Sequence, residues 1–284
     1  MAAQVESGAL ELRTIRGPSA FGGEVRRFWN LIWLTAAADY KTRYLNSWLG
    51  YAWSLLRPLL FFAVLYVVFT RVVRFGGEIE NYAALLLLNI MLFQFFSDAT
   101  GSAVRCVVQR ENLVRKMQFP RIVVPLSVVL NSLLIAVMNM VAALVLILVI
   151  GVEPRWTWLL IPVVLALLCV FTTGVALALA ALYPRFRDVE QIWGVAARAL
   201  FYASPVIFPI ELVPESWRGL VAANPLTPIL EQARIWVIDA DAPTLLDAAG
   251  SAAVLLVSAV IFVGACVIGL LLFEREAPRV AEEL

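Results

Sequence analysis

The segment IVVPLSVVLNSLLIAVMNMVAALVLILVI at residues 122–150 contains no Asp, Glu, Lys or Arg. Because a bilayer core about 30 Å thick needs about 20 helical residues to cross it, this segment is long enough to span a membrane. Further apolar stretches predict spans at 54–73, 82–104, 157–182, 189–208 and 246–273. Hydrophobic residues make up 62% of the 284 residues and the mean hydropathy is +0.87, which is far from the composition of a soluble domain. The sequence therefore predicts an all-α integral membrane protein with six transmembrane helices.

Positive charge is divided very unequally between the segments that join these spans. With the N-terminus inside, 16 of the 22 Lys and Arg residues fall on the inner side. The outer side then holds five, namely Arg71, Arg74, Arg155, Arg218 and Arg234. Because cytoplasmic loops of membrane proteins carry an excess of Lys and Arg, we expect both termini to face the cytoplasm.

The polar and amphipathic segments predict the organisation of the chain. Residues 1–24 are expected to be a flexible cytoplasmic tail, 51–273 the six-span domain and 274–284 a second cytoplasmic tail. Within 25–50, apolar residues such as Trp29, Ile32 and Trp33 recur at helical spacing, with Arg26 and Arg27 on the other side. This pattern predicts a helix lying in the cytoplasmic membrane interface, although packing against the spans explains it as well.

Two loops and one proline-rich segment interrupt the spans. The basic loop RCVVQRENLVRKMQFPRIVVP predicts a short helix at about 110–118, which is either a docking element or an ordinary solvated loop. A second inner loop, YPRFRDVEQIWG, begins at Tyr183. Between about 204 and 240, five prolines forbid one continuous helix, and we expect two short helices in a re-entrant or interfacial hairpin at the outer surface, before the last span.

The order of these parts resembles the permease subunits of bacterial polysaccharide ABC exporters, which are type-2 ABC exporters. The resemblance rests on DYKTRYLNSWLGYAW, ENLVRKMQFPRIVVP, FRDVEQ and the stretch from Ser204-Pro205 through Asn224-Pro225. It implies a homodimer of this chain, joined to two ATP-binding subunits, in the bacterial cytoplasmic (inner) membrane. The implied cargo is a lipid-linked polysaccharide such as the O-antigen of lipopolysaccharide, teichoic acid, capsule or galactan.

The resemblance also implies which residues couple the permease to its ATPase. The coupling helix would contain Glu111, Asn112, Leu113, Val114, Arg115 and Lys116. Arg185, Arg187 and Asp188 would form a second contact or hinge at the same face. The sequence contains no G-x-x-x-x-G-K-[ST] loop to hold nucleotide phosphates, so we expect ATP and Mg to be bound by a partner subunit. We expect no cofactor, metal or catalytic site on this chain, which has no histidine and three cysteines without metal-ligand spacing.

Aromatic side chains and one arginine are the candidates for substrate contact. Phe62, Tyr66 and Phe69 fall at i, i+4 and i+7 in the first predicted span, and their flat rings suit the C–H faces of sugars. Lipid-facing or helix-packing roles explain the same stripe. Arg198 lies about nine residues into the predicted span 189–208, roughly 14 Å deep at 1.5 Å per residue.

A guanidinium at that depth suits the pyrophosphate of a polyprenyl-linked substrate. A structural pair of Arg198 with Asp98 or Glu190, or extension of its side chain to the inner membrane edge, is the alternative. The small residues Ala265 and Gly269, four apart, would permit close helix approach.

The sequence is compatible with two other functions. One is a drug or lipid exporter permease of the same superfamily. The other is an integral membrane enzyme acting on polyprenyl-linked sugars, which would need acids, histidines or a nucleophile clustered at one membrane face. The cytoplasmic loops instead hold mostly arginines with scattered acids, so an enzyme is not expected.

Overall fold

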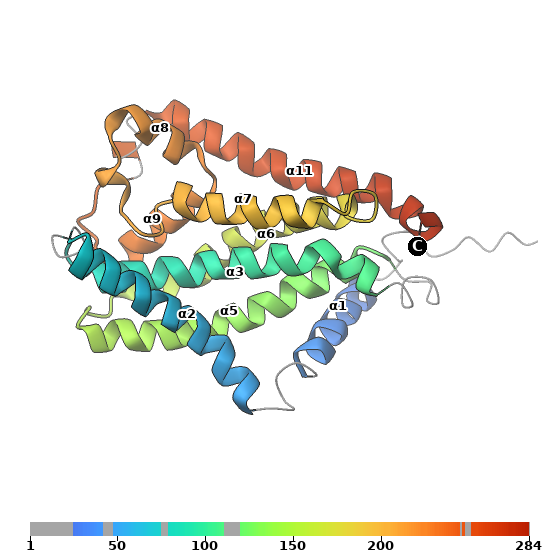
Figure 1. The fold of residues 1–284 in the computed structure, drawn as a ribbon, viewed down its shortest axis with the longest axis horizontal. Helices are drawn as coiled ribbons and strands as arrows, with labels where there is room; N and C mark the ends of the chain where they lie inside the picture. Colours follow the sequence, from blue (N-terminus) through green and yellow to red (C-terminus); the bar gives the residue numbers. More distant parts are fainter. Residues whose placement is uncertain are drawn as a thin grey trace, which may run out of the picture.

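The computed structural model describes residues 25–41, 48–74, 79–110, 120–244, 246–247 and 251–283, and every regular element among them is helical. The elements are α1 (Val25–Tyr40), α2 (Trp48–Val67) with its π-helical continuation η2 (Val68–Val72), α3 (Tyr82–Gln109), α5 (Val123–Ile150), η4 (Trp156–Leu160), α6 (Ile161–Leu182), α7 (Val189–Ala203), η5 (Ile210–Leu212), α8 (Glu215–Ala223), α9 (Leu226–Val237) and α11 (Ala252–Glu283). The long helices run side by side, α8 and α9 gather at one end, and α1 and the C-terminus lie toward the other (Figure 1).

Five of these helices are long and apolar enough to cross a membrane. They cover Ala52–Val72, Tyr82–Gln109, Val123–Ile150, Trp156–Leu182 and Ala252–Glu276. Each coincides with a span expected from hydropathy, because an apolar run of this length satisfies its backbone polar groups in lipid only as a helix. The all-α membrane fold and five of the expected spans are therefore confirmed.

The remaining expected span, 189–208, is shorter in the structure. Helix α7 has 15 residues and ends at Ala203, because Ser204 precedes Pro205 and takes an extended conformation with φ −106° and ψ 154°. A residue before proline is disfavoured in the α region, so the helix stops there. The last span also begins later than position 246, since α11 starts at Ala252.

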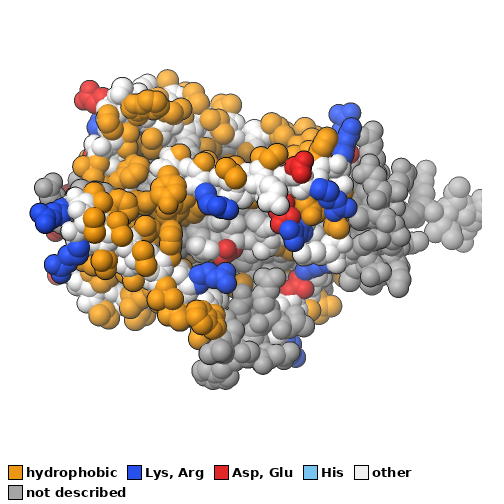
Figure 2. All heavy atoms as spheres, viewed as in Figure 1, with side chains coloured by type: hydrophobic (Ala, Val, Ile, Leu, Met, Phe, Trp, Pro, Cys, Tyr) orange, Lys and Arg blue, Asp and Glu red, His pale blue; other side chains and the backbone are white. Residues whose placement is uncertain are grey.

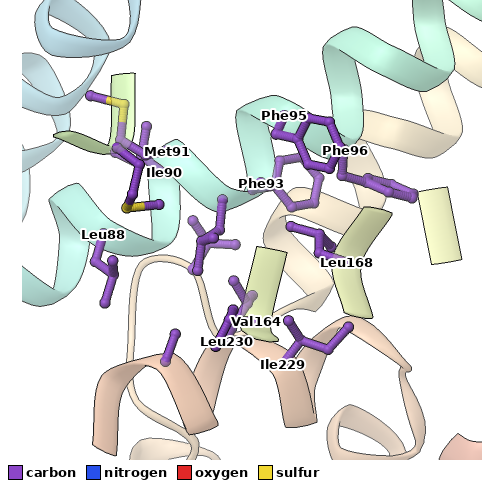
Figure 3. Close-up of a cluster of buried hydrophobic side chains, with 14 of the residues drawn as sticks. Leu88, Ile90, Met91, Phe93, Phe95, Phe96, Val164, Leu168, Ile229 and Leu230 are labelled. Atoms are coloured by element: carbon purple, nitrogen blue, oxygen red, sulfur yellow. The ribbon is translucent and has the colours of Figure 1, made fainter. Parts of the chain in front are cut away.

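Helix α3 is the centre of the protein. Its residues from Leu85 to Phe93 are nearly all below 6% exposure, on every side of the helix. A helix that is apolar all round is a buried one, and α3 accordingly contacts α2, α5, α6, α7 and α9. Figure 3 shows α3 side chains such as Phe93 and Phe96 gathered with Leu168 of α6 and Leu230 of α9.

Helices α6 and α11 approach each other through glycine. A Cβ atom built on Gly269 would lie 1.9 Å from the carbonyl oxygen of Gly174, and one on Gly174 would lie 2.6 Å from the Cα atom of Cys266. The close approach expected around Ala265 and Gly269 is thus confirmed. The partner glycine on α6 was not predicted, because spacing within one helix does not identify the helix that packs against it.

Some apolar residues of α1 are buried against the protein and others are exposed. Ile32 and Ala36 are buried and α1 packs on α5, whereas Trp29 and Trp33 are more than half exposed. Packing against the membrane-spanning helices therefore explains the apolar residues Ile32 and Ala36, but not the two tryptophans. The helix ends at Tyr40 within the expected segment 25–50, and residues 48–50 already belong to α2.

Helices α2 and α11 leave most of their surface uncovered. In their most apolar stretches, 6% of α2 residues and 11% of α11 residues are buried, against 78% for α3. Figure 2 shows the resulting surface, with orange hydrophobic side chains over much of one face. Such faces are stable in contact with lipid or with another hydrophobic protein surface.

Candidate functional site

The end of the protein that carries the C-terminus brings together the start of α7 and the end of α3. The expected coupling helix lies outside the described residues, since positions 111–119 are not described. Its preceding residue, Arg110, is well anchored: its guanidinium donates to Ser127 Oγ on α5 at 3.0 Å and forms an ion pair with Asp39 of α1. Helices α1 and α5 therefore fix the point where the chain leaves α3.

The second predicted coupling segment, at 185–188, is exposed to solvent. The Arg185 guanidinium lies 5.2 Å from the ring centroid of Phe186, and that of Arg187 lies 5.1 Å from the ring of Tyr183. Asp188 precedes the first turn of α7, where its carbonyl oxygen accepts the Ile192 N–H at 3.0 Å. The cation–π contacts hold both arginines close to the turn without burying their charge.

An ion pair joins α3 to α7 close to these segments. Arg105, in the last turns of α3, donates to Glu190 in the first turn of α7. Their side chains are 50% and 30% exposed. This pair was not predicted, because the sequence separation of 85 residues gives no sign that the two helix ends meet.

The predicted aromatic stripe forms part of a larger set of ring contacts. Phe62 stacks on Tyr66 with 5.7 Å between centroids, and Tyr66 stacks on Tyr82 of α3 at 6.4 Å. Phe62 and Phe69 also pack against the hydrophobic core and are half-buried, whereas Tyr66 is 37% exposed. In the single chain, the helix-packing explanation thus applies to part of this stripe.

A second group of rings links α2, α3 and α7. Phe201 of α7 lies 5.4 Å from Phe61 of α2 and 5.2 Å from Phe93 of α3, measured between centroids. The neighbouring Tyr202 is 63% exposed. Offset and edge-on ring pairs of this kind are favourable and directional, so they fix α7 relative to α2.

Arg198 lies on α7 with its side chain exposed. Its Nε donates to the Gly194 carbonyl oxygen at 3.2 Å. Of the two acids proposed as partners, Glu190 pairs with Arg105, and Asp98 accepts a hydrogen bond from Gln94 at 2.7 Å. The guanidinium therefore keeps donors available on the surface of the described chain.

The proline-rich segment forms two short helices, α8 and α9, and a cluster of charged side chains ties α9 to the 3-10 turn η5. Arg234 of α9 donates to both carboxylate oxygens of Glu211, at 2.9 and 3.0 Å, and to Glu231 at 3.2 Å. Glu231 in turn accepts the backbone N–H of Ile210 at 3.0 Å. Burial raises the pKa of Glu231 to about 7, although the nearby Arg234 works in the opposite direction.

This cluster was not predicted from the sequence. An acid and an arginine spaced i, i+3 in a moderately apolar helix are the signal that points to it. One further hydrogen bond ties the segment to α3, since Asn89 donates to the Pro205 carbonyl at 2.9 Å. Within the segment, Asn224 donates to Ser204 Oγ at 2.8 Å.

Comparison with known proteins is consistent with this arrangement. The family model described as ABC-2 type transporter matches residues 30–238. The O-antigen export system permease protein RfbA of Klebsiella pneumoniae is 30% identical over 193 residues, which cover 68% of this chain and 74% of that protein. The protein of the same name from Myxococcus xanthus is 31% identical over 209 residues, covering 73% and 80%. The polysialic acid transport protein KpsM of Escherichia coli is 20% identical over 201 residues, covering 69% and 76%. The family match runs from α1 to the end of α9, and this chain belongs to the ABC-2 type transporter family.

Proposed function

We propose that this chain is the permease subunit of an ATP-driven exporter that moves lipid-linked polysaccharide across the bacterial cytoplasmic membrane. The observation that carries the proposal is the family match over 30–238, together with relatives named for O-antigen export and polysialic acid transport. In this proposal the chain forms a homodimer and two separate subunits bind ATP and Mg. Both termini face the cytoplasm, and α7 with the residues up to Phe208 makes the sixth crossing.

Coupling to the ATPase would use the end of the protein where α3 ends and α7 begins. Residues 111–118 would enter a cleft on the ATPase, with Arg185, Arg187 and Asp188 as the second contact. The ion pair of Arg105 with Glu190 supports this idea, because it connects the end of α3 to the start of α7. A displacement of the coupling segment would then reach α7, and through Phe201 the ring contacts with α2.

The transport path would lie on the side of the protein that presents α2 and α7. Tyr66 and Tyr202 leave ring surface exposed there, which supports contact with the C–H faces of sugars. Arg198 would meet the pyrophosphate that joins the polymer to its lipid, since its exposed guanidinium suits phosphate oxygens. The hairpin of α8 and α9 would line the outer exit.

The experiment is co-purification of the full chain with candidate ATPase subunits expressed in the same cells. We expect an ATPase to co-purify with the wild type and to be lost when residues 111–118 are replaced by a Gly/Ser segment of equal length. The matched control replaces the exposed Arg155 and Trp156, at the opposite end of α6 from Arg185, and retains the ATPase. Stable protein that binds none of the ATPases offered would contradict the proposal.

A further inference from the structure

A polar cavity of about 250 Å³ lies between α2, α3 and α5, within the stretches that cross the membrane. Its lining includes Arg57 of α2, Gln94 and Asp98 of α3, and Asn139 of α5. Figure 2 shows isolated blue and red side chains among the orange and white atoms in the middle of one face. Ionisable residues at membrane depth are costly in lipid and mark sites that hold water or a polar ligand.

Asn139 gives this cavity an unsatisfied hydrogen-bond acceptor. Its side chain is 8% exposed, and among the described residues nothing donates to its Oδ1 atom. Its amide nitrogen makes one long contact of 3.5 Å to the Ser54 carbonyl oxygen. The Oδ1 atom is itself buried, so a guest in the cavity reaches it when the Asn139 side chain turns toward it. A buried carbonyl without a donor costs about 1–3 kcal/mol, which favours a guest that carries hydroxyl or amide donors.

The rest of the lining has the chemistry of a carbohydrate site. Asp98 supplies a carboxylate to the lining, and this carboxylate accepts a hydrogen bond from Gln94 at 2.7 Å. Arg57 supplies donors for sugar oxygens, while the half-exposed Trp53 ring supplies a flat apolar face. The volume far exceeds the share of about 30 Å³ that one water has in the liquid, which leaves room for a sugar residue.

We propose that this cavity binds the sugar headgroup of a glycolipid from within the membrane, with sugar hydroxyls donating to Asn139 and Asp98. The inference rests on the proposed function, because it names the part of the lipid-linked substrate that the permease recognises. A second cavity of about 170 Å³ shares Ser102 and Ser132 with it and extends toward Asp39 and Arg110. The two cavities are therefore neighbours between α3 and α5.

The test measures lipid binding by the purified permease in phosphatidylcholine nanodiscs, without an ATPase, by native mass spectrometry. The probe is a farnesyl lipid that carries N-acetylglucosamine through a diphosphate, and farnesyl diphosphate is the comparison without sugar. We expect the sugar-bearing lipid to bind at least tenfold more tightly than farnesyl diphosphate. Equal binding of the two would mean that phosphate alone is recognised, and would overturn the sugar site.

Two variants separate recognition from folding. Asn139→Leu removes the acceptor with little change in volume, so we expect unchanged or higher thermal stability and at least tenfold weaker binding of the sugar-bearing lipid. Asn131→Leu is the matched control: it sits eight residues away on α5, its Oδ1 is also without a donor among the described residues, and it lines the smaller cavity only. The affinity of the Asn131→Leu variant for the sugar-bearing lipid should stay within twofold of wild type.

Asp98→Asn keeps the size of the side chain, removes its charge and should weaken binding by about tenfold, a change of about 1.4 kcal/mol. Wild-type affinity in both Asn139→Leu and Asp98→Asn, or equal losses in Asn139→Leu and Asn131→Leu, would overturn the proposal. Because no ATPase is present, ATP-driven export by a permease that fails this binding test would leave the proposed function standing and remove only the sugar site.

Discussion

Glu231 and Arg234 stabilise the segment between α7 and α11 from within, since their side chains are 5% and 9% exposed. A carboxylate in such a position loses much of its hydration, and the adjacent guanidinium recovers part of that loss. The pair also has a structural purpose, because the Glu231 carboxylate accepts the Ile210 N–H and Arg234 holds Glu211. Helix α9 and the turn η5 are thereby fixed to each other.

The raised pKa of Glu231 predicts a pH dependence of stability. Its pKa is 4.5 in the unfolded chain and about 7 in the folded one, so the folded state binds the extra proton between these values. The contribution is fully present below pH 4.5 and is lost as the pH rises through 7, by about 3 kcal/mol at most. We expect Glu231→Gln to flatten this decline in thermal unfolding scans between pH 5 and pH 8. A variant whose stability falls as steeply as the wild type would contradict the assignment.

The ion pair of Arg105 with Glu190 predicts an effect on coupling rather than on folding. Because Arg105 is exposed and Glu190 is only partly buried, water screens the pair and its contribution to stability is small. Arg105→Glu should therefore leave the melting temperature nearly unchanged while lowering ATP-driven export several-fold. The double variant Arg105→Glu with Glu190→Arg restores opposite charges and should recover export. Failure of the double variant to recover, with intact ATPase binding, would argue against this contact as a link.

At the scale of helices, the contact between α6 and α11 depends on the absence of side chains at two positions. Gly269→Ala would place a methyl group against the Gly174 backbone, which can move away only by separating the helices. We expect a loss of about 1–3 kcal/mol, as for other overpacked sites, measured by thermal unfolding in detergent. Gly264→Ala on the same helix meets nothing within 4 Å and is the matched control. Equal stability of the two variants would show that the helices do not approach so closely.

Hydropathy predicted which segments form helices better than it predicted which helices pack together. Uninterrupted apolar runs such as 122–150 identify membrane-spanning helices because lipid permits few alternatives. The end of α7 at Ala203 depends on Pro205. A mean hydropathy taken over about 20 residues does not respond to a single proline. That α3 lies at the centre while α2 lies outside was not predictable from hydropathy, since the central helix α3 is the less apolar of the two.

The same limit applies to the candidate sites: single residues could be named from the sequence, but the contacts between them could not. Residues 185–188 were predicted from the family pattern, and the structure leaves them exposed at the start of α7. The pairs Arg105–Glu190 and Arg234–Glu211 join residues 85 and 23 positions apart, so only the folded chain brings them together. Asn139 resembles any polar residue in a span until the cavity beside it is known.

At the scale of the whole molecule, the uncovered faces of α2 and α11 make the single chain unsuited to water and suited to lipid or to a second copy. In the proposed dimer, the α2 and α7 side of each chain would face the transport path, and the ends that carry the C-termini would face the ATPase subunits. This arrangement requires that ATP hydrolysis by the partner and movement of the polymer occur together.

The most direct measurement is transport in proteoliposomes that contain the chain, its co-purifying ATPase and lipid-linked polysaccharide extracted from the same cells. Polymer exposed on the far side of the membrane is labelled by a lectin or an antibody. We predict labelling that depends on ATP and is abolished by replacing residues 111–118. A complex that hydrolyses ATP but exposes no polymer, with an intact membrane and substrate present, would contradict export of polysaccharide by this chain.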